Sequence, residues 1–66
     1  MRVVLRNPRR VVDMAGPIGV DQLLRRLEVN RESVLVIVND TLVTDDATVD
    51  DDATVEVRPV ISGGAA

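Results

Sequence analysis

Short runs of apolar, mostly β-branched residues near the N-terminus predict a pair of strands. Residues 2–6 form the first run and residues 10–14 the second, and Asn7-Pro8 between them is a turn signal. We therefore expect a hairpin at the start of the chain. Residues 15–19 follow as a connecting loop. Its glycines are not followed by the Gly-Lys-Ser/Thr of a phosphate-binding loop, which excludes that kind of site.

The next segment changes from the spacing of a strand to the spacing of a helix. Apolar residues fall at i, i+3, i+4 and i+7, namely Val20, Leu23, Leu24 and Leu27. Asp21 lies in the first turn, where its charge suits the helix dipole. We predict a helix over residues 20–28, ended by Asn30, with its leucine stripe buried in the core.

A continuous apolar run at residues 34–38 predicts a central strand with apolar groups on both faces. We assign Leu35 and Ile37 to the face that meets the helix. The other face then carries a candidate docking patch, which consists of Val34, Val36 and Val38. A docking surface is one interpretation of this patch, and a second layer of self-packing or simple β-propensity explains it equally well.

The second half of the chain predicts two further strands separated by an acidic loop. Asn39-Asp40 is a tight-turn signal, residues 41–43 form a short strand, and residues 54–58 alternate as a last strand with Val55 and Val57 inward. Aspartates crowd the loop at 45–52, which Val49 pins. They lack the alternating ligands and central glycine of an EF-hand, so a solvated turn is favoured over a calcium site.

This order of elements predicts an α+β fold. Two hairpin strands, a crossover helix and later strands pack most economically as a four- or five-stranded mixed sheet gripping one main helix, which is a β-grasp. We assign residues 1–60 to this domain. Residues 61–66 are then a flexible C-terminal diglycine tail with a two-residue extension.

Composition excludes several classes of function for this chain of 66 residues. It has no cysteine and no histidine, so the usual disulfides, metal ligands and general base are missing. We therefore predict no metal site and no enzymatic activity. No apolar run approaches the ~20 residues of a membrane span. We expect a cytoplasmic monomer.

Charge is distributed unevenly along the chain. All eight basic residues are arginine; residues 1–33 hold seven of them against four acidic residues, whereas residues 34–66 hold one against seven. The net charge is −3 and no residue is aromatic. This composition argues against direct nucleic-acid binding, so the acidic half is interpreted as a solvated rim.

The chain ends in two glycines followed by two alanines. A glycine carboxylate has no β-carbon to obstruct attack, and tandem glycines thread channels too narrow for other residues. We therefore interpret the carboxylate of Gly64 as the working group of a carrier. Ala65 and Ala66 would have to be removed first. A cloning scar and a harmless end are the alternatives for these two residues.

The predicted β-grasp order, closed by Gly63-Gly64, resembles the ubiquitin-like sulfur carriers of bacteria and archaea. This family includes the thiazole-synthesis carrier and the small subunit of molybdopterin synthase. Residues 1–6 with Pro8 and Arg10, and the tail residues 61–64, are similar to the carriers that serve 2-thiouridine-type modification of tRNA. The resemblance covers the whole predicted domain.

The resemblance implies a route through a partner enzyme. An adenylating enzyme, similar to those that activate ubiquitin, would use ATP and Mg to activate Gly64, and a sulfur donor would then give a thiocarboxylate. Ile61, Ser62 and Gly63 would thread that enzyme. A JAMM-type metalloprotease would cleave after Gly64, and a sulfurtransferase would use the sulfur, for tRNA 2-thiolation in the first place. The chain itself would bind no cofactor.

Other functions stay open at this point. The same adenylate could be captured by lysines of target proteins, which would make the chain a protein modifier, and the two roles can coexist. The sulfur could instead serve thiamine, molybdopterin or amino-acid synthesis. A plain interaction module with an idle tail is the alternative from another class.

Overall fold

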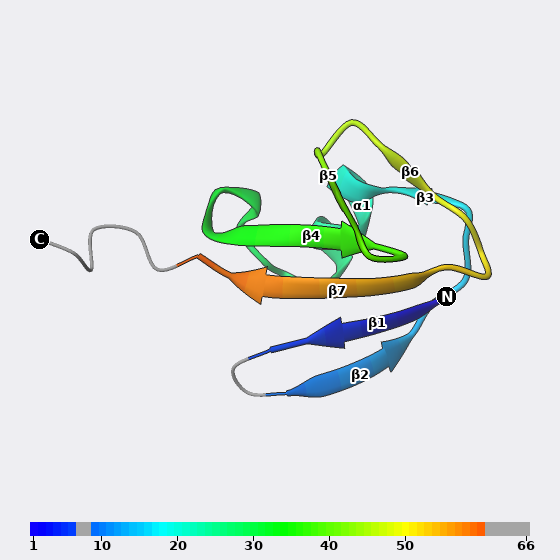
Figure 1. The fold of residues 1–66 in the computed structure, drawn as a ribbon, viewed down its shortest axis with the longest axis horizontal. Coiled ribbons are helices and arrows are strands. Elements are labelled where there is room, and N and C mark those ends of the chain that lie inside the picture. The colour runs from blue at the N-terminus through cyan, green and yellow to red at the C-terminus, as the bar shows by residue number, and fades with distance from the viewer. Residues whose placement is uncertain (7–8, 61–66) are drawn as a thin grey trace, which may run out of the picture.

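Residues 1–6 and 9–60 are described by a computed structural model, in which five strands form one mixed sheet (Figure 1). In spatial order β2-β1-β7-β4-β5, the strands are β2 (Arg10–Asp13), β1 (Arg2–Leu5), β7 (Thr54–Pro59), β4 (Val34–Val38) and β5 (Thr41–Val43). β1 and β7 are parallel, and the other neighbouring pairs are antiparallel. The predicted α+β, β-grasp architecture is confirmed.

The remaining elements cover one face of this sheet or connect its strands. They are the helix α1 (Val20–Arg26), the 3-10 turn η1 (Arg31–Ser33), and the short strands β3 (Ile18–Gly19) and β6 (Thr48–Val49). β3 and β6 pair with each other in a separate two-stranded ribbon. The sequence predicted loops at both places. Each strand is only two residues long, too short to show a period of two against neighbouring turn residues.

The helix ends earlier than predicted, at Arg26 and not at residue 28. Glu28 adopts a left-handed conformation with φ of 58°, and its N–H donates to the carbonyl of Arg25. The N–H of Val29 donates to the carbonyl of Leu24 at 3.0 Å. These two bonds form a Schellman motif, which satisfies the last carbonyls of the helix. Glycine usually occupies the left-handed position, so a glutamate there gave no stop signal.

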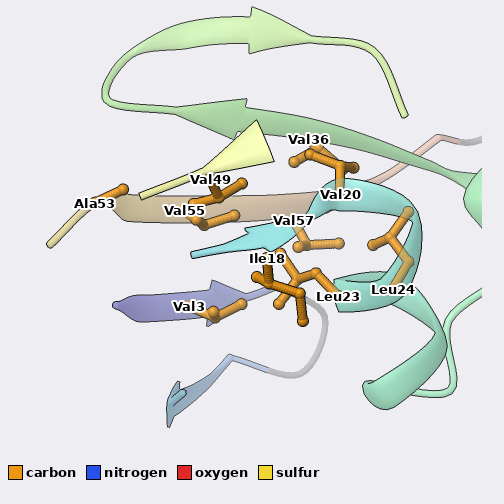
Figure 2. Close-up of a cluster of buried hydrophobic side chains, with 10 residues drawn as sticks. All are labelled: Val3, Ile18, Val20, Leu23, Leu24, Val36, Val49, Ala53, Val55 and Val57. Atoms are coloured by element: carbon orange, nitrogen blue, oxygen red, sulfur yellow. The ribbon is translucent and has the colours of Figure 1, made fainter. Parts of the chain in front are cut away.

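A core without aromatic side chains lies between the helix and the sheet (Figure 2). Leu23 and Val20 of α1 are fully buried, and they pack over Val3 and Val55 of the two central strands. The buried set is completed by Ile18, Leu24, Val36, Val49, Ala53 and Val57. The leucine stripe of the helix and the inward valines of β7 are therefore confirmed as core.

The assignment of faces on β4 was wrong. Val36 is 5% exposed and belongs to the core, whereas Leu35 is 45% exposed. Val34 and Val38 are partly buried against the same core. The cause lies in the register, because Val36 pairs with Val57 of β7, and directly paired residues share a face of the sheet.

No helix within the described residues is long and apolar enough to cross a membrane.

Candidate functional site

The tail begins at the end of the central strand β7, at a fixed point on the domain. Val34 pairs with Pro59, and the N–H of Val60 donates to the carbonyl of Ser33 at 2.8 Å. The six predicted tail and processing residues lie outside the described residues: Ile61, Ser62, Gly63, Gly64, Ala65 and Ala66. The structure therefore defines where the tail starts but not its path.

The turn that holds Val60 is itself braced. Asn30 caps η1, since its side-chain oxygen accepts from the N–H of Glu32 at 3.0 Å. The guanidinium of Arg31 pairs with Asp45 and, at 3.8 Å, with Asp21 of α1. Exposed ion pairs of this kind contribute only about 0–1 kcal/mol each. Their use here is geometric, because they tie the turn next to the tail to two other parts of the fold.

Within residues 1–6 and 9–60, the face of the sheet opposite the helix carries exposed side chains, and we call it the open face. One cross-strand row on this face contains a residue from each strand: Val11, Val4, Glu56, Ile37 and Leu42, in spatial order from β2 to β5. Val11 is 49% and Leu42 62% exposed. Leu35, next to this row, adds a further exposed apolar side chain. We call the five residues of the row, together with Leu35, the open-face row. The row gives the domain an apolar surface with one carboxylate near its middle.

The predicted docking patch of Val34, Val36 and Val38 is therefore incorrect, since these residues face the core. The continuous apolar run in β4 carries no periodicity that would distinguish its two faces. The alternation in β7 carries this information, because its valines are inward and its Glu56 lies opposite Ile37. That pairing places Ile37 on the open face.

Glu56 is held by two arginines on the open face. Its Oε2 atom accepts from the Nε atom of Arg58 at 2.8 Å and from the Nε atom of Arg6 at 2.9 Å. The hydrogen bond from Arg58, helped by that from Arg6, lowers the pKa of Glu56 below its usual 4.5, although desolvation acts in the opposite direction. Glu56 thus stays ionised and orders both guanidinium groups.

Removing Arg58 is expected to raise the pKa of Glu56 toward its ordinary value. The ionised carboxylate stabilises the folded state above the unfolded-state pKa, near 4.5, and this contribution is lost as the pH falls through the lower folded-state pKa. Carbon-13 NMR titration of the Glu56 carboxyl in the wild type and in Arg58→Ala measures the change. Arg2→Ala is the matched control, since it removes the same charge from the same sheet. Equal titration of Glu56 in the wild type and Arg58→Ala would refute the assignment.

Three aspartates of the second half have partners among the described residues. Asp51 accepts from the N–H of Gly16 at 2.7 Å, Asp45 pairs with Arg31, and Asp46 accepts from the hydroxyl of Thr44. Across residues 1–6 and 9–60, no group of three or more acidic side chains could hold a metal ion.

Comparison with protein families identifies the chain. A family model described as the ThiS family matches residues 4–64, which is nearly the whole chain and ends on the second glycine. No curated protein matches it. The match is to the family as a whole, so the similarity to carriers for tRNA thiolation stays a prediction. Fold and match agree, and the chain belongs to the ThiS family of small, non-catalytic, ubiquitin-like sulfur carriers.

Proposed function

We propose that this sulfur carrier works through the carboxylate of Gly64 and supplies sulfur for the 2-thiolation of tRNA. The observation that carries the first part is the family match, which includes both glycines and stops before Ala65. The tRNA acceptor is supported by the likeness of residues 1–6 and 61–64 to carriers of that branch. Both ends of the chain thus favour the same use.

The chain's own chemistry requires the sulfur to be carried at its end. Without cysteine there is no side chain that could hold a persulfide or a thioester. A carboxylate is a poor electrophile at neutral pH, so a partner must activate it. The adenylating enzyme would join the Gly64 carboxylate to AMP and release pyrophosphate from Mg-ATP. A sulfide equivalent from a donor would then displace AMP and leave a thiocarboxylate.

A free Gly64 carboxylate exists only after the Gly64–Ala65 peptide bond has been hydrolysed. We assign this step to a zinc metalloprotease of the JAMM type, which acts before activation. Gly63 and Gly64 carry no β-carbon, so the tail is narrow enough to enter the clefts of both the protease and the adenylating enzyme. Ile61 and Ser62 form the extended lead from the domain to the reacting atom.

The open-face row is the surface on which the adenylating enzyme would dock. It joins exposed apolar side chains to a defined polar group, which is the composition of a specific protein interface. Ile37 lies on β4 and Glu56 on β7, and these are the strands that fix the start of the tail. Docking on this face would therefore hold the tail at a set distance from the enzyme's nucleotide site.

Intact-mass measurement tests the carrier role directly. The chain ending at Gly64 and the chain ending at Ala66 are each incubated with the adenylating enzyme encoded in the same genome, Mg-ATP and a sulfur donor. Exchange of one oxygen for sulfur is expected on the shorter chain alone. If the enzyme forms its adenylate with another carrier but neither chain changes mass, the carrier role through Gly64 is refuted.

The acceptor needs a separate experiment in cells. Deleting the gene is expected to remove 2-thiouridine-type nucleosides from tRNA, while growth without thiamine and molybdoenzyme activity stay normal. Restoring the chain that ends at Gly64 should restore thiolation, and a chain lacking Gly64 should not. Loss of thiamine or molybdopterin synthesis with intact tRNA thiolation would assign the sulfur to that pathway instead.

A second candidate function is protein modification through the same adenylate. The chain has no lysine, so a modifier of this kind would not be extended into lysine-linked chains of itself. Target lysines would attack the Gly64 adenylate and release AMP, which leaves an isopeptide bond. Isopeptide-linked conjugates in which a target lysine carries the C-terminal segment ending in Gly63-Gly64, recovered from cells only when the chain is present, would support this role.

A further inference from the structure

The charges of the domain are separated along its central strand. Arg6, Arg10 and Arg58 lie around the end of β7, where the tail begins. Together with Arg9, the exposed residue before Arg10, we call them the arginine cluster. Asp13, Asp40 and the turn at 50–52 lie near the other end, where β7 starts. In Figure 1, β1 and β7 point toward the side where the chain leaves the sheet. The domain therefore has a basic end at the tail and an acidic end away from it.

The arginine cluster surrounds the start of the tail on both sides of the sheet. Arg6, Arg58 and Pro59 line one hollow. Arg6, Arg10 and Pro59 also line a second hollow, which continues to Leu27 of the helix side. Arg10 pairs with Leu5, whose side chain packs against the core, so Arg10 belongs to the helix side of the sheet. Pro59 thus has Arg58 beside it in the first hollow and Arg10 in the second, and Arg6 lines both.

The charge of the cluster is only partly neutralised. Glu56 binds the Nε atoms of Arg6 and Arg58, and the carboxylate of Glu28 shares the second hollow. The side chains of Arg6 and Arg58 are 49% and 54% exposed, and Arg9 and Arg10 are exposed as well. Hydrogen bonds through Nε leave the terminal amino groups of each guanidinium as donors. The cluster is therefore a cationic surface whose geometry suits carboxylates.

We propose that the arginine cluster binds a carboxylate-rich rim around the tail-accepting cleft of the adenylating enzyme. This inference rests on the proposed function, since it names the chemistry of that enzyme's surface. A protein is favoured over a nucleic acid because Arg58 lies beside Leu35 on the open face, so the basic and apolar surfaces are continuous. An apolar centre with arginine at its border is typical of protein interfaces. The net charge of −3 and the lack of aromatic residues oppose binding to RNA.

The separation of charge also orients the approach of the two proteins. An acidic rim attracts the arginine end and repels the aspartate end, so the encounter occurs with the tail in front. Such steering raises association rates by about 10- to 1,000-fold and weakens as salt is added. The tail residues then enter the cleft while the domain is held by the same arginines.

Pyrophosphate exchange by the adenylating enzyme of the same genome tests this inference. The chain ending at Gly64 is the varied substrate, at low and at physiological ionic strength. Charge reversal by Arg10→Glu or Arg58→Glu is expected to lower kcat/KM roughly tenfold or more at low salt, mainly through KM. The loss should shrink at the higher salt. Arg2→Glu, the same change at the other end of β1, is the matched control and should stay within about twofold.

The outcomes separate this inference from the proposed function. If the wild-type chain and both variants support pyrophosphate exchange at the same rate at either salt concentration, the acidic rim is refuted and sulfur carriage stands. If the wild-type chain is inactive with a competent enzyme, both fall. Binding of bulk tRNA by the wild type, lost in Arg10→Glu while exchange is unaffected, would overturn the inference and assign the cluster to RNA. Circular dichroism confirms that each variant is folded.

Discussion

Leu23→Ala is expected to leave much of the chain unfolded at room temperature. Leu23 is fully buried at the centre of the face that α1 presents to the sheet. Truncating a buried leucine costs about 2–5 kcal/mol, because apolar contacts are lost and a cavity remains. A core of this size supplies only about 3–5 kcal/mol in total, and this chain has no disulfide to add to it. Far-UV circular dichroism during urea unfolding measures the loss.

Leu42→Ala is the matched control for this prediction. It removes the same atoms from a side chain that is 62% exposed, on the edge strand β5. Its effect on the free energy of unfolding should stay within about 0.5 kcal/mol. A Leu23→Ala chain as stable as Leu42→Ala would show that the helix does not close the core.

The double change Ile37→Gln and Leu42→Gln is expected to prevent efficient activation without unfolding the domain. The two residues are neighbours on the open face, paired across β4 and β5. Apolar contacts at the centre of an interface are worth about 1–3 kcal/mol each when they are hot spots. Two such losses add to about 2 kcal/mol or more, so the KM for the chain ending at Gly64 should rise about 30-fold or more in pyrophosphate exchange.

Gln22→Ala controls for a change elsewhere on the surface, since Gln22 is an exposed residue of the helix. Its KM should equal that of the wild type. Circular dichroism should show the double variant folded, because neither side chain belongs to the core. A folded double variant with unchanged KM would place the docking surface elsewhere than on the open face.

Most of this fold could be predicted from the sequence, because apolar residues are spaced differently in helices and in strands and the longer elements show this spacing. The leucines of α1 and the alternation in β7 predicted buried faces correctly. β3 and β6 were missed because two residues show no period. The end of the helix was placed two residues too late because Glu28 adopts a left-handed conformation within the Schellman motif. Glutamate, unlike glycine, does not indicate that conformation in a sequence.

The chemistry of the candidate site stays a prediction from the sequence, whereas the surface around it could be described only from the structure. Gly63 and Gly64 were proposed because few other functions require a terminal diglycine, and both lie outside the described residues. The exposed face of β4 could not be predicted, because the run at Val34–Val38 is apolar at every position and only pairing with β7 selects its face. The arginine cluster likewise depends on tertiary structure, since β1 and β7 are far apart in the sequence and adjacent in the sheet.

The parallel pairing of β1 with β7 has a consequence for the synthesis of this protein. Arg2 of β1 pairs with Thr54 of β7. During translation, β1 is therefore synthesised well before the strand with which it pairs. Without β7, β1 and β4 share no neighbour and the sheet divides into two hairpins. Long-range pairing of this kind slows folding, because the chain between the two strands must close into a loop before they pair. A prematurely terminated chain that lacks β7 therefore offers a protease an open polypeptide, and the chains that survive as folded domains are those whose translation has reached the strand that bears the tail.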